Sequence, residues 1–131
     1  MNAELVYLLL VALLTGSLWI PVVIGYVRTR GPLTPEAYRV APSDPLPPWV
    51  NRANRAHLNA VESFAPFAAV VLAGQVLGVH TAATTTCAAV YFWARLGHYL
   101  VLTLGIPYLR TLVWTVAWAA QMVIAWQVLA R

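Results

Sequence analysis

Hydrophobic residues fill four long runs of this chain, and polar residues gather between the first two runs. The runs cover residues 5–27, 56–79, 81–104 and 111–130. Each run approaches or exceeds the roughly 20 residues that an α-helix needs to cross a hydrocarbon core of about 30 Å. The pattern therefore predicts an all-α fold in which residues 1–131 form a single integral membrane domain, a bundle of four helices.

The segment 28–55 interrupts the apolar pattern and holds six of the nine prolines of the chain. Because proline lacks a backbone N–H and disfavours a long helix, we expect an irregular loop there. Arginines crowd this loop, whereas the turn at His80 has none. The positive-inside rule then places the 28–55 loop and the turn before Arg110 in the cytoplasm. Within the first run, Pro21 predicts a kink.

The composition supports a membrane protein and excludes other classes. Hydrophobic residues make up 61% of the chain and charged residues 9%, outside the range of ordinary soluble domains. The chain has no lysine, and its arginines are scattered along the apolar runs, so they do not form the basic face of a nucleic-acid-binding protein. Cys87 is the only cysteine, so no intrachain disulfide can form. Compact loops and the absence of lysine favour a bacterial inner membrane.

A strongly polar helix face marks the start of the second apolar run. Arg52, Arg55, Asn59 and Glu62 lie at offsets of zero, three, seven and ten residues. At about 100° per residue they stay within roughly an 80° arc of a helix. Charged side chains at membrane depth are costly and usually mark a functional site. This face is therefore the first candidate site.

The third run contains a second polar group, in which Arg95 shares a helix face with His98 and Tyr99. Counted from the expected ends of their helices, Arg95 and Glu62 each lie about ten residues, or roughly 15 Å, from the cytoplasmic surface. An unpaired charge at that depth costs several kcal/mol. We therefore predict an ion pair between Arg95 and Glu62 that joins the second and third helices.

Basic residues outnumber acidic ones at the predicted cytoplasmic end, and this surplus favours an anionic ligand. The candidate binding residues there are Arg52, Arg55, Asn59, Glu62, Arg95, His98, Tyr108 and Arg110. Arginine binds carboxylates through forked hydrogen bonds, and Glu62 could receive a ligand ammonium group. A tripeptide with two carboxylates, one amine and one thiol meets these requirements, and an arginine beside the thiol would favour the thiolate. We expect no metal site.

Two other interpretations stay open. In the first, Arg95 and Glu62 only lock two helices together, while the outer arginines extend to the lipid headgroups. In the second, the chain is a small exporter in which a membrane carboxylate couples protons to transport. The arginines around Glu62 speak against the exporter, because they should hold this carboxylate ionised.

Two stretches of the chain resemble the MAPEG family, the membrane-associated proteins of eicosanoid and glutathione metabolism. They are RANRAHLNAVESFAPF, residues 52–67, and ARLGHYLVLTLGIPYLRTL, residues 94–112. The resemblance extends over essentially the whole chain. It implies a homotrimer of four-helix protomers that binds glutathione between neighbouring subunits, on the cytoplasmic side.

The resemblance also implies roles for residues. Contacts with glutathione would come from Arg55, Asn59, Glu62, Arg95 and His98, with Arg28 as a further basic residue of the site, while Arg110 would activate the thiol. Two positions depart from the family pattern, because Leu102 replaces a common tyrosine and Leu58 replaces a basic residue of some members. Because of these two departures, the resemblance gives weaker support for full catalytic activity of this chain.

The function that the resemblance implies is that of an enzyme. We expect a glutathione-dependent transferase, or a peroxidase or isomerase of the same type, that acts on an apolar electrophile arriving from the membrane lipid. Detoxification is one role for such an enzyme. The alternative is a non-catalytic membrane protein of the same fold that binds a lipid or an anion.

Overall fold

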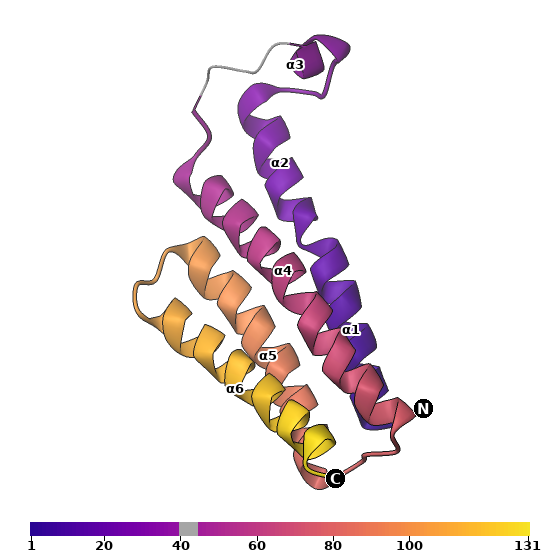
Figure 1. Cartoon of the computed structure of the whole chain (residues 1–131). Helices are drawn as coiled ribbons and strands as arrows, with labels where there is room; N and C mark the ends of the chain where they lie inside the picture. The colour runs from indigo at the N-terminus through magenta and orange to yellow at the C-terminus, as the bar shows by residue number, and fades with distance from the viewer. Residues whose placement is uncertain (40–44) are drawn as a thin grey trace.

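A computed structural model describes residues 1–39 and 45–131 of the chain. Within these residues all regular structure is helical (Figure 1). The helices are α1 (Ala3–Ser17), α2 (Trp19–Arg30), α3 (Pro35–Arg39), α4 (Pro48–Val76), α5 (Ala82–Leu104) and α6 (Leu109–Leu129). The predicted all-α fold is therefore confirmed.

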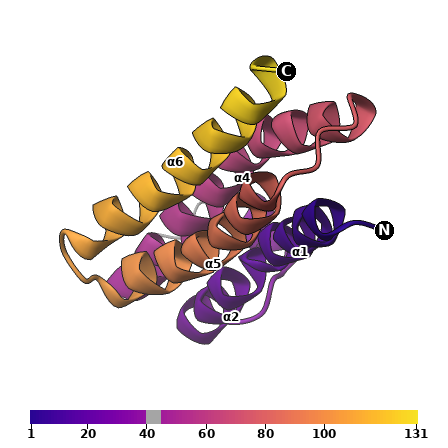
Figure 2. The ribbon, with the colours of Figure 1, turned by 90° about the horizontal axis from the view of Figure 1, so that it is seen from below.

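Four spans are long and apolar enough to cross a membrane, as the hydrophobic pattern predicts. They are Ala3–Arg30, Pro48–Val76, Ala82–Leu104 and Leu109–Leu129, and α1 and α2 together make the first of them. The chain is thus an integral membrane protein with four candidate spans. Helix α5 packs against α1, α4 and α6, and α4 packs against α1, α2, α5 and α6, so these two helices connect the bundle (Figure 2).

The first span is interrupted where α1 ends and α2 begins. Because Pro21 cannot donate a backbone hydrogen bond and crowds the preceding turn, it disturbs the helix on its N-terminal side. The interruption falls at Leu18, whose backbone C=O accepts a hydrogen bond from the Tyr99 hydroxyl at 3.2 Å. Helix α5 thus supplies a polar partner inside the bundle at the point where the first span changes direction.

Helix α4 begins at Pro48, inside the predicted 28–55 loop. Residues 52–55, which the polar pattern already placed on a helix face, form its first turns together with residues 48–51 before them. Pro47 and Pro48 do not keep the chain irregular, because a proline in the first helical turn has the required φ and its missing N–H would have no partner there. Residues 40–44 of the predicted loop lie outside the described residues.

The middle of the bundle has an apolar core fixed by one polar contact. Phe67 of α4 stacks on Tyr91 of α5 with ring centroids 3.7 Å apart. The Tyr91 hydroxyl donates a hydrogen bond to the backbone C=O of Ser63 at 3.0 Å. This contact supports the α4 backbone beside Pro66, which cannot donate a hydrogen bond of its own. The stacked pair therefore sets how α4 and α5 face one another.

Most of the arginines lie at one end of the bundle, which we call the arginine end. At this end α2 and α5 finish and α4 and α6 begin, whereas both chain termini lie at the opposite end (Figure 1). The arginines concerned are Arg28, Arg30, Arg39, Arg52, Arg55 and Arg110. That this end faces the cytoplasm stays a prediction.

Close packing of α2 on α4 depends on the absence of a side chain at Gly25. A Cβ atom added there would lie 2.5 Å from Val50 Cγ2 and 2.7 Å from Trp49 Cη2, closer than real contacts allow. We therefore expect Gly25→Ala to lower stability by about 1–3 kcal/mol, the usual cost of overpacking. The measurement is the thermal unfolding midpoint of the detergent-purified protein.

Gly16→Ala is the matched control, because a Cβ added at Gly16 of α1 meets nothing within 4 Å. Alanine favours the helix more than glycine does, so this variant should unfold at or above the wild-type temperature. Equal midpoints for the two variants would contradict the close contact at Gly25.

Candidate functional site

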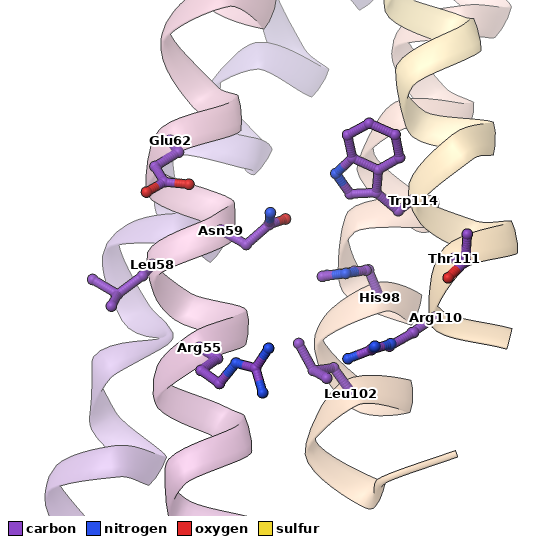
Figure 3. Close-up of a pocket in the computed structure, with 9 residues that line it drawn as sticks. All are labelled: Arg55, Leu58, Asn59, Glu62, His98, Leu102, Arg110, Thr111 and Trp114. Atoms are coloured by element: carbon purple, nitrogen blue, oxygen red, sulfur yellow. The ribbon is translucent and has the colours of Figure 1, made fainter. Parts of the chain in front are cut away.

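A cavity of about 430 Å³, which we call the central cavity, opens at the arginine end between α4 and the α5–α6 pair (Figure 3). Its lining consists of Arg55, Leu58, Asn59, Glu62, His98, Leu102, Arg110, Thr111 and Trp114. Pockets of about 300–1,000 Å³ hold small-molecule ligands. The cavity therefore has the size of a small-molecule site.

Local helix geometry places these side chains together. On α4, positions 55, 59 and 62 recur at intervals of three and four residues and so share one face. Helix α5 ends at Leu104 and is followed by Gly105, which has φ 75° in the left-handed region that favours glycine, and the chain then reverses into α6. This tight reversal brings Arg110 and Thr111 beside the last turns of α5.

Two guanidinium groups give the central cavity its charge. Arg55 from α4 and Arg110 from α6 extend toward one another across the cavity (Figure 3). Neither forms an ion pair or a hydrogen bond with the rest of the described chain. Glu62 is the one acidic residue in the lining, so the cavity carries a net positive charge. Such a site suits an anionic ligand.

His98 adds a buried polar group to the same cavity. Its side chain is only 5% exposed, and its Nδ1 atom has no hydrogen-bond partner among the described residues. Because buried polar groups are normally hydrogen-bonded, each exception needs an explanation. His98 thus carries a buried nitrogen that no described residue satisfies.

A second cavity, the mouth cavity, lies next to the central cavity around the α5–α6 turn. It has a volume of about 530 Å³, and its lining consists of Arg52, Leu102, Gly105, Ile106, Pro107, Tyr108, Arg110 and Thr111. Tyr108 has φ 63°, an uncommon conformation for a residue other than glycine. It follows Pro107 and precedes α6, so it marks the sharpest point of the turn.

Arg52 has a structural role at the mouth cavity. Its Nε donates a hydrogen bond to the backbone C=O of Thr103 at 3.1 Å, where α5 ends. A Cβ atom added at Gly105 would lie 3.0 Å from the Arg52 guanidinium carbon, so glycine also makes room for this contact. The cation therefore stabilises the C-terminus of α5, where backbone carbonyls lack partners.

A third cavity, the deep cavity, lies further from the arginine end. Its volume is about 340 Å³, and its lining consists of Asn59, Glu62, Ser63, Pro66, Tyr91, Arg95, Trp114, Ala117, Trp118 and Gln121. It adjoins the central cavity, because both contain Asn59, Glu62 and Trp114. The two cavities thus form one polar region that runs into the bundle.

The predicted ion pair between Arg95 and Glu62 is wrong. Arg95 Nη2 instead donates a hydrogen bond to Asn59 Oδ1 at 2.8 Å, and Glu62 forms no ion pair with the described residues. The prediction placed the start of α4 too late. Since α4 begins at Pro48, Glu62 lies about 21 Å along the helix, whereas Arg95 lies about 14 Å from the end of α5. Asn59, at about 17 Å, is the closer match in depth.

The structure brings most of the predicted site residues together. Those that line the central cavity are Arg55, Asn59, Glu62, His98 and Arg110. Arg52 and Tyr108 line the mouth cavity, and Arg95 lines the deep cavity. Arg28, in the last turn of α2, is exposed and lines none of these three cavities.

Sequence reasoning assigned several polar or aromatic residues of the cavities to no site, among them Thr111, Trp114 and Gln121. Thr111 and Trp114 follow Arg110 on the first turns of α6 and line the central cavity. Trp114 lies four residues after Arg110 and so shares a helix face with it, which was an available signal; the adjacent Thr111 gives no such signal. Gln121 is one of two glutamines in an apolar run, and nothing in the sequence distinguishes it from Gln127 or pairs it with α4 or α5.

Comparison with known protein families gives a match over nearly the whole chain. The model of the MAPEG family matches residues 5–130, and this confirms the resemblance inferred from the two polar stretches. The family includes glutathione transferases and peroxidases. No curated protein matches the chain, and no solved structure matches it.

The Arg95–Asn59 contact generates a prediction about stability. Asn59→Leu would leave the buried Arg95 cation without its hydrogen-bond partner, and loss of one partner of a buried charge costs about 3–5 kcal/mol. We expect a strongly lowered thermal unfolding midpoint in detergent. Asn59→Asp keeps an acceptor oxygen and should unfold close to the wild type. If Asn59→Leu is as stable as Asn59→Asp, Arg95 does not depend on this residue.

Proposed function

Because the chain belongs to the MAPEG family, we propose that it is a membrane-bound glutathione-dependent transferase, or a peroxidase or isomerase of the same type. Glutathione would occupy the central cavity. The observation that carries this proposal is the pair of guanidinium groups, Arg55 and Arg110, which face one another without a carboxylate partner in the described chain. Two free cations around one cavity call for a ligand with more than one anionic group.

The lining matches the chemical groups of glutathione. A carboxylate of glutathione would accept hydrogen bonds from the Arg55 guanidinium group, and the ammonium group of glutathione would lie near Glu62, the only acid of the lining. Asn59 and His98 offer further polar contacts. When bound, glutathione supplies the thiol nucleophile. We assign Arg110 to this thiol, because a cation beside a thiol stabilises the thiolate.

The apolar part of the lining suits the second substrate. Leu58, Leu102 and Trp114 share the central cavity with the charged residues, and Trp118 of α6 is 50% exposed on the surface that a membrane would cover. An apolar electrophile could therefore reach the site from the lipid. We further propose a homotrimer in a bacterial inner membrane, with the arginine end in the cytoplasm, where glutathione is dissolved.

One observation favours a second candidate function. Leu102 is only 7% exposed and lines the central cavity where the family often has a tyrosine, so the cavity lacks that hydroxyl group. A protein without it could bind an anion or a lipid and catalyse nothing. Glutathione binding without turnover of any electrophile would select this alternative.

The first prediction of the proposal concerns affinity. We expect Arg55→Gln to weaken glutathione binding roughly tenfold or more, because a hydrogen bond to a charged group contributes about 1.5–3 kcal/mol. Equilibrium dialysis of the detergent-purified protein measures this. Arg39→Gln is the matched control, since Arg39 is exposed on α3 and lines none of the three cavities. Equal affinity of both variants would remove Arg55 from the site.

The second prediction concerns the thiol. Arg110→Ala should lower the thiolate fraction of bound glutathione at neutral pH, because the cation that stabilises the anion is lost. The ultraviolet absorbance of the thiolate reports this fraction in a sample saturated with glutathione. Arg110→Lys keeps a positive charge and should restore part of the signal. A thiolate signal that is the same in Arg110→Ala and the wild type would assign activation to another residue.

A further inference from the structure

The turn between α4 and α5 places His80 next to the start of α1, at the end of the bundle where both chain termini lie (Figure 1). His80 Nδ1 lies 3.2 Å from Asn2 Nδ2 and 4.0 Å from Glu4 Oε2. One ring nitrogen therefore has two neighbours of opposite character, an amide group that donates a hydrogen bond and a carboxylate that accepts one.

The orientation of the Asn2 amide determines the protonation state of His80 in this arrangement. Asn2 Oδ1 accepts a hydrogen bond from the backbone N–H of Leu5 at 3.2 Å. Its Nδ2 atom is therefore the one that points to Gln75 Oε1, at 2.6 Å, and to His80. Because an amide nitrogen only donates, His80 Nδ1 must accept and carries no proton. The contact with Asn2 thus requires the neutral imidazole.

Glu4 is held in place independently of His80. The hydroxyls of Thr84 and Thr85, in the first turn of α5, donate hydrogen bonds to Glu4 Oε1 at 2.7 and 2.9 Å. The Glu4 side chain is only 6% exposed, whereas the His80 side chain is 42% exposed. The carboxylate is therefore fixed and shielded from water, while the imidazole can exchange a proton with the solvent.

Protonation of His80 would replace one neighbour by the other. A protonated Nδ1 can no longer accept from Asn2, but it can donate to Glu4 Oε2, which already lies 4.0 Å away. A hydrogen bond between two charged groups is stronger than one between neutral groups. We propose that His80 and Glu4 form an acid-dependent latch, in which protonation of His80 creates an ion pair that ties the α4–α5 turn to α1.

The latch has a defined direction with pH. Histidine is the side chain whose charge ordinarily changes between about pH 5 and 8. Since the ion pair exists only with the protonated imidazole, the stability that it adds is present at acid pH and is lost as the pH rises. If the arginine end is cytoplasmic, as predicted, the latch responds to the pH outside the cytoplasm. Neither of its residues lines any of the three cavities, so it does not depend on glutathione binding.

The other charged groups at this end of the described chain are cations. They are the Met1 amino group and the side chain of Arg131, which donates a hydrogen bond to the backbone C=O of Leu77 after the end of α4. The residues that α4 and α5 contribute around His80 and Glu4 are uncharged, namely Gln75, Thr84 and Thr85. Glu4 is therefore the acidic side chain with which a protonated His80 can pair.

Thermal unfolding at two pH values tests the latch. The full chain and its His80→Asn variant are purified in a nonionic detergent and unfolded at about pH 5.5 and about pH 8. Asparagine keeps a polar group in the half-exposed turn but stays neutral, so the variant should fold. We expect the wild type to unfold about 2–4 °C above His80→Asn at the acid pH, as one partly exposed ion pair implies, and at the same temperature at the higher pH.

Comparing the two proteins at the same pH removes the contribution of the other titrating groups, which both proteins share. Glu4→Gln then supplies the matched background, because its amide oxygen can still accept from Thr84 and Thr85 while the charge is gone. In this background, His80→Asn should change the midpoint equally at both pH values. If Glu4→Gln does not fold, Glu4→Asp takes its place. It withdraws the carboxylate by one methylene group and should at least halve the pH-dependent difference.

Two results would overturn the proposal. The first is a difference between the wild type and His80→Asn that is equal at both pH values or larger at the higher one, because the neutral contact with Asn2 would then be at least as strong as the ion pair. The second is a pH-dependent difference that persists undiminished in the Glu4 variant, because a protonated His80 would then act through another group.

Discussion

The interaction on which the site depends is the hydrogen bond from Arg95 to Asn59. A cation that is 4% exposed inside a membrane span cannot be left without a partner, because its desolvation would cost several kcal/mol. Together with the Phe67–Tyr91 stack, the 2.8 Å contact with Asn59 fixes the rotation of α4 relative to α5. Since Arg55 and Glu62 share that face of α4, the same contact points them toward the central cavity.

Arg95 pairs with the neutral amide of Asn59, and this affects the net charge of the polar region. An amide satisfies one donor of Arg95 but leaves its positive charge in place, whereas a carboxylate would cancel it. Glu62 is thereby free to line two cavities without an ion pair in the described chain. The polar region therefore keeps a positive surplus and one uncommitted acid, which is the arrangement that a ligand with both carboxylates and an amine requires.

The sequence was sufficient for the four spans and for the polar face of α4, because hydropathy and helical periodicity depend only on local order. It was not sufficient for pairing between helices. The error over Arg95 and Glu62 arose because α4 begins at Pro48, and a shift of one turn changes which residues meet. The contact of Arg52 with the end of α5 requires the space left by Gly105. Gln121 lines the deep cavity only because of the register of α6 against α4.

The opposite end of the bundle shows that this chain can satisfy a buried charge completely. Glu4 is 4% exposed, and it accepts hydrogen bonds from the hydroxyls of Thr84 at 2.7 Å and Thr85 at 2.9 Å, with His80 Nδ1 4.0 Å away. At the arginine end, Arg55 and Arg110 are exposed and need no protein partner, but the buried His98 leaves its Nδ1 atom without a hydrogen-bond partner among the described residues. Because buried polar groups are normally hydrogen-bonded, the two ends of the bundle differ. The contrast is accounted for if ligands complete the polar region at the arginine end.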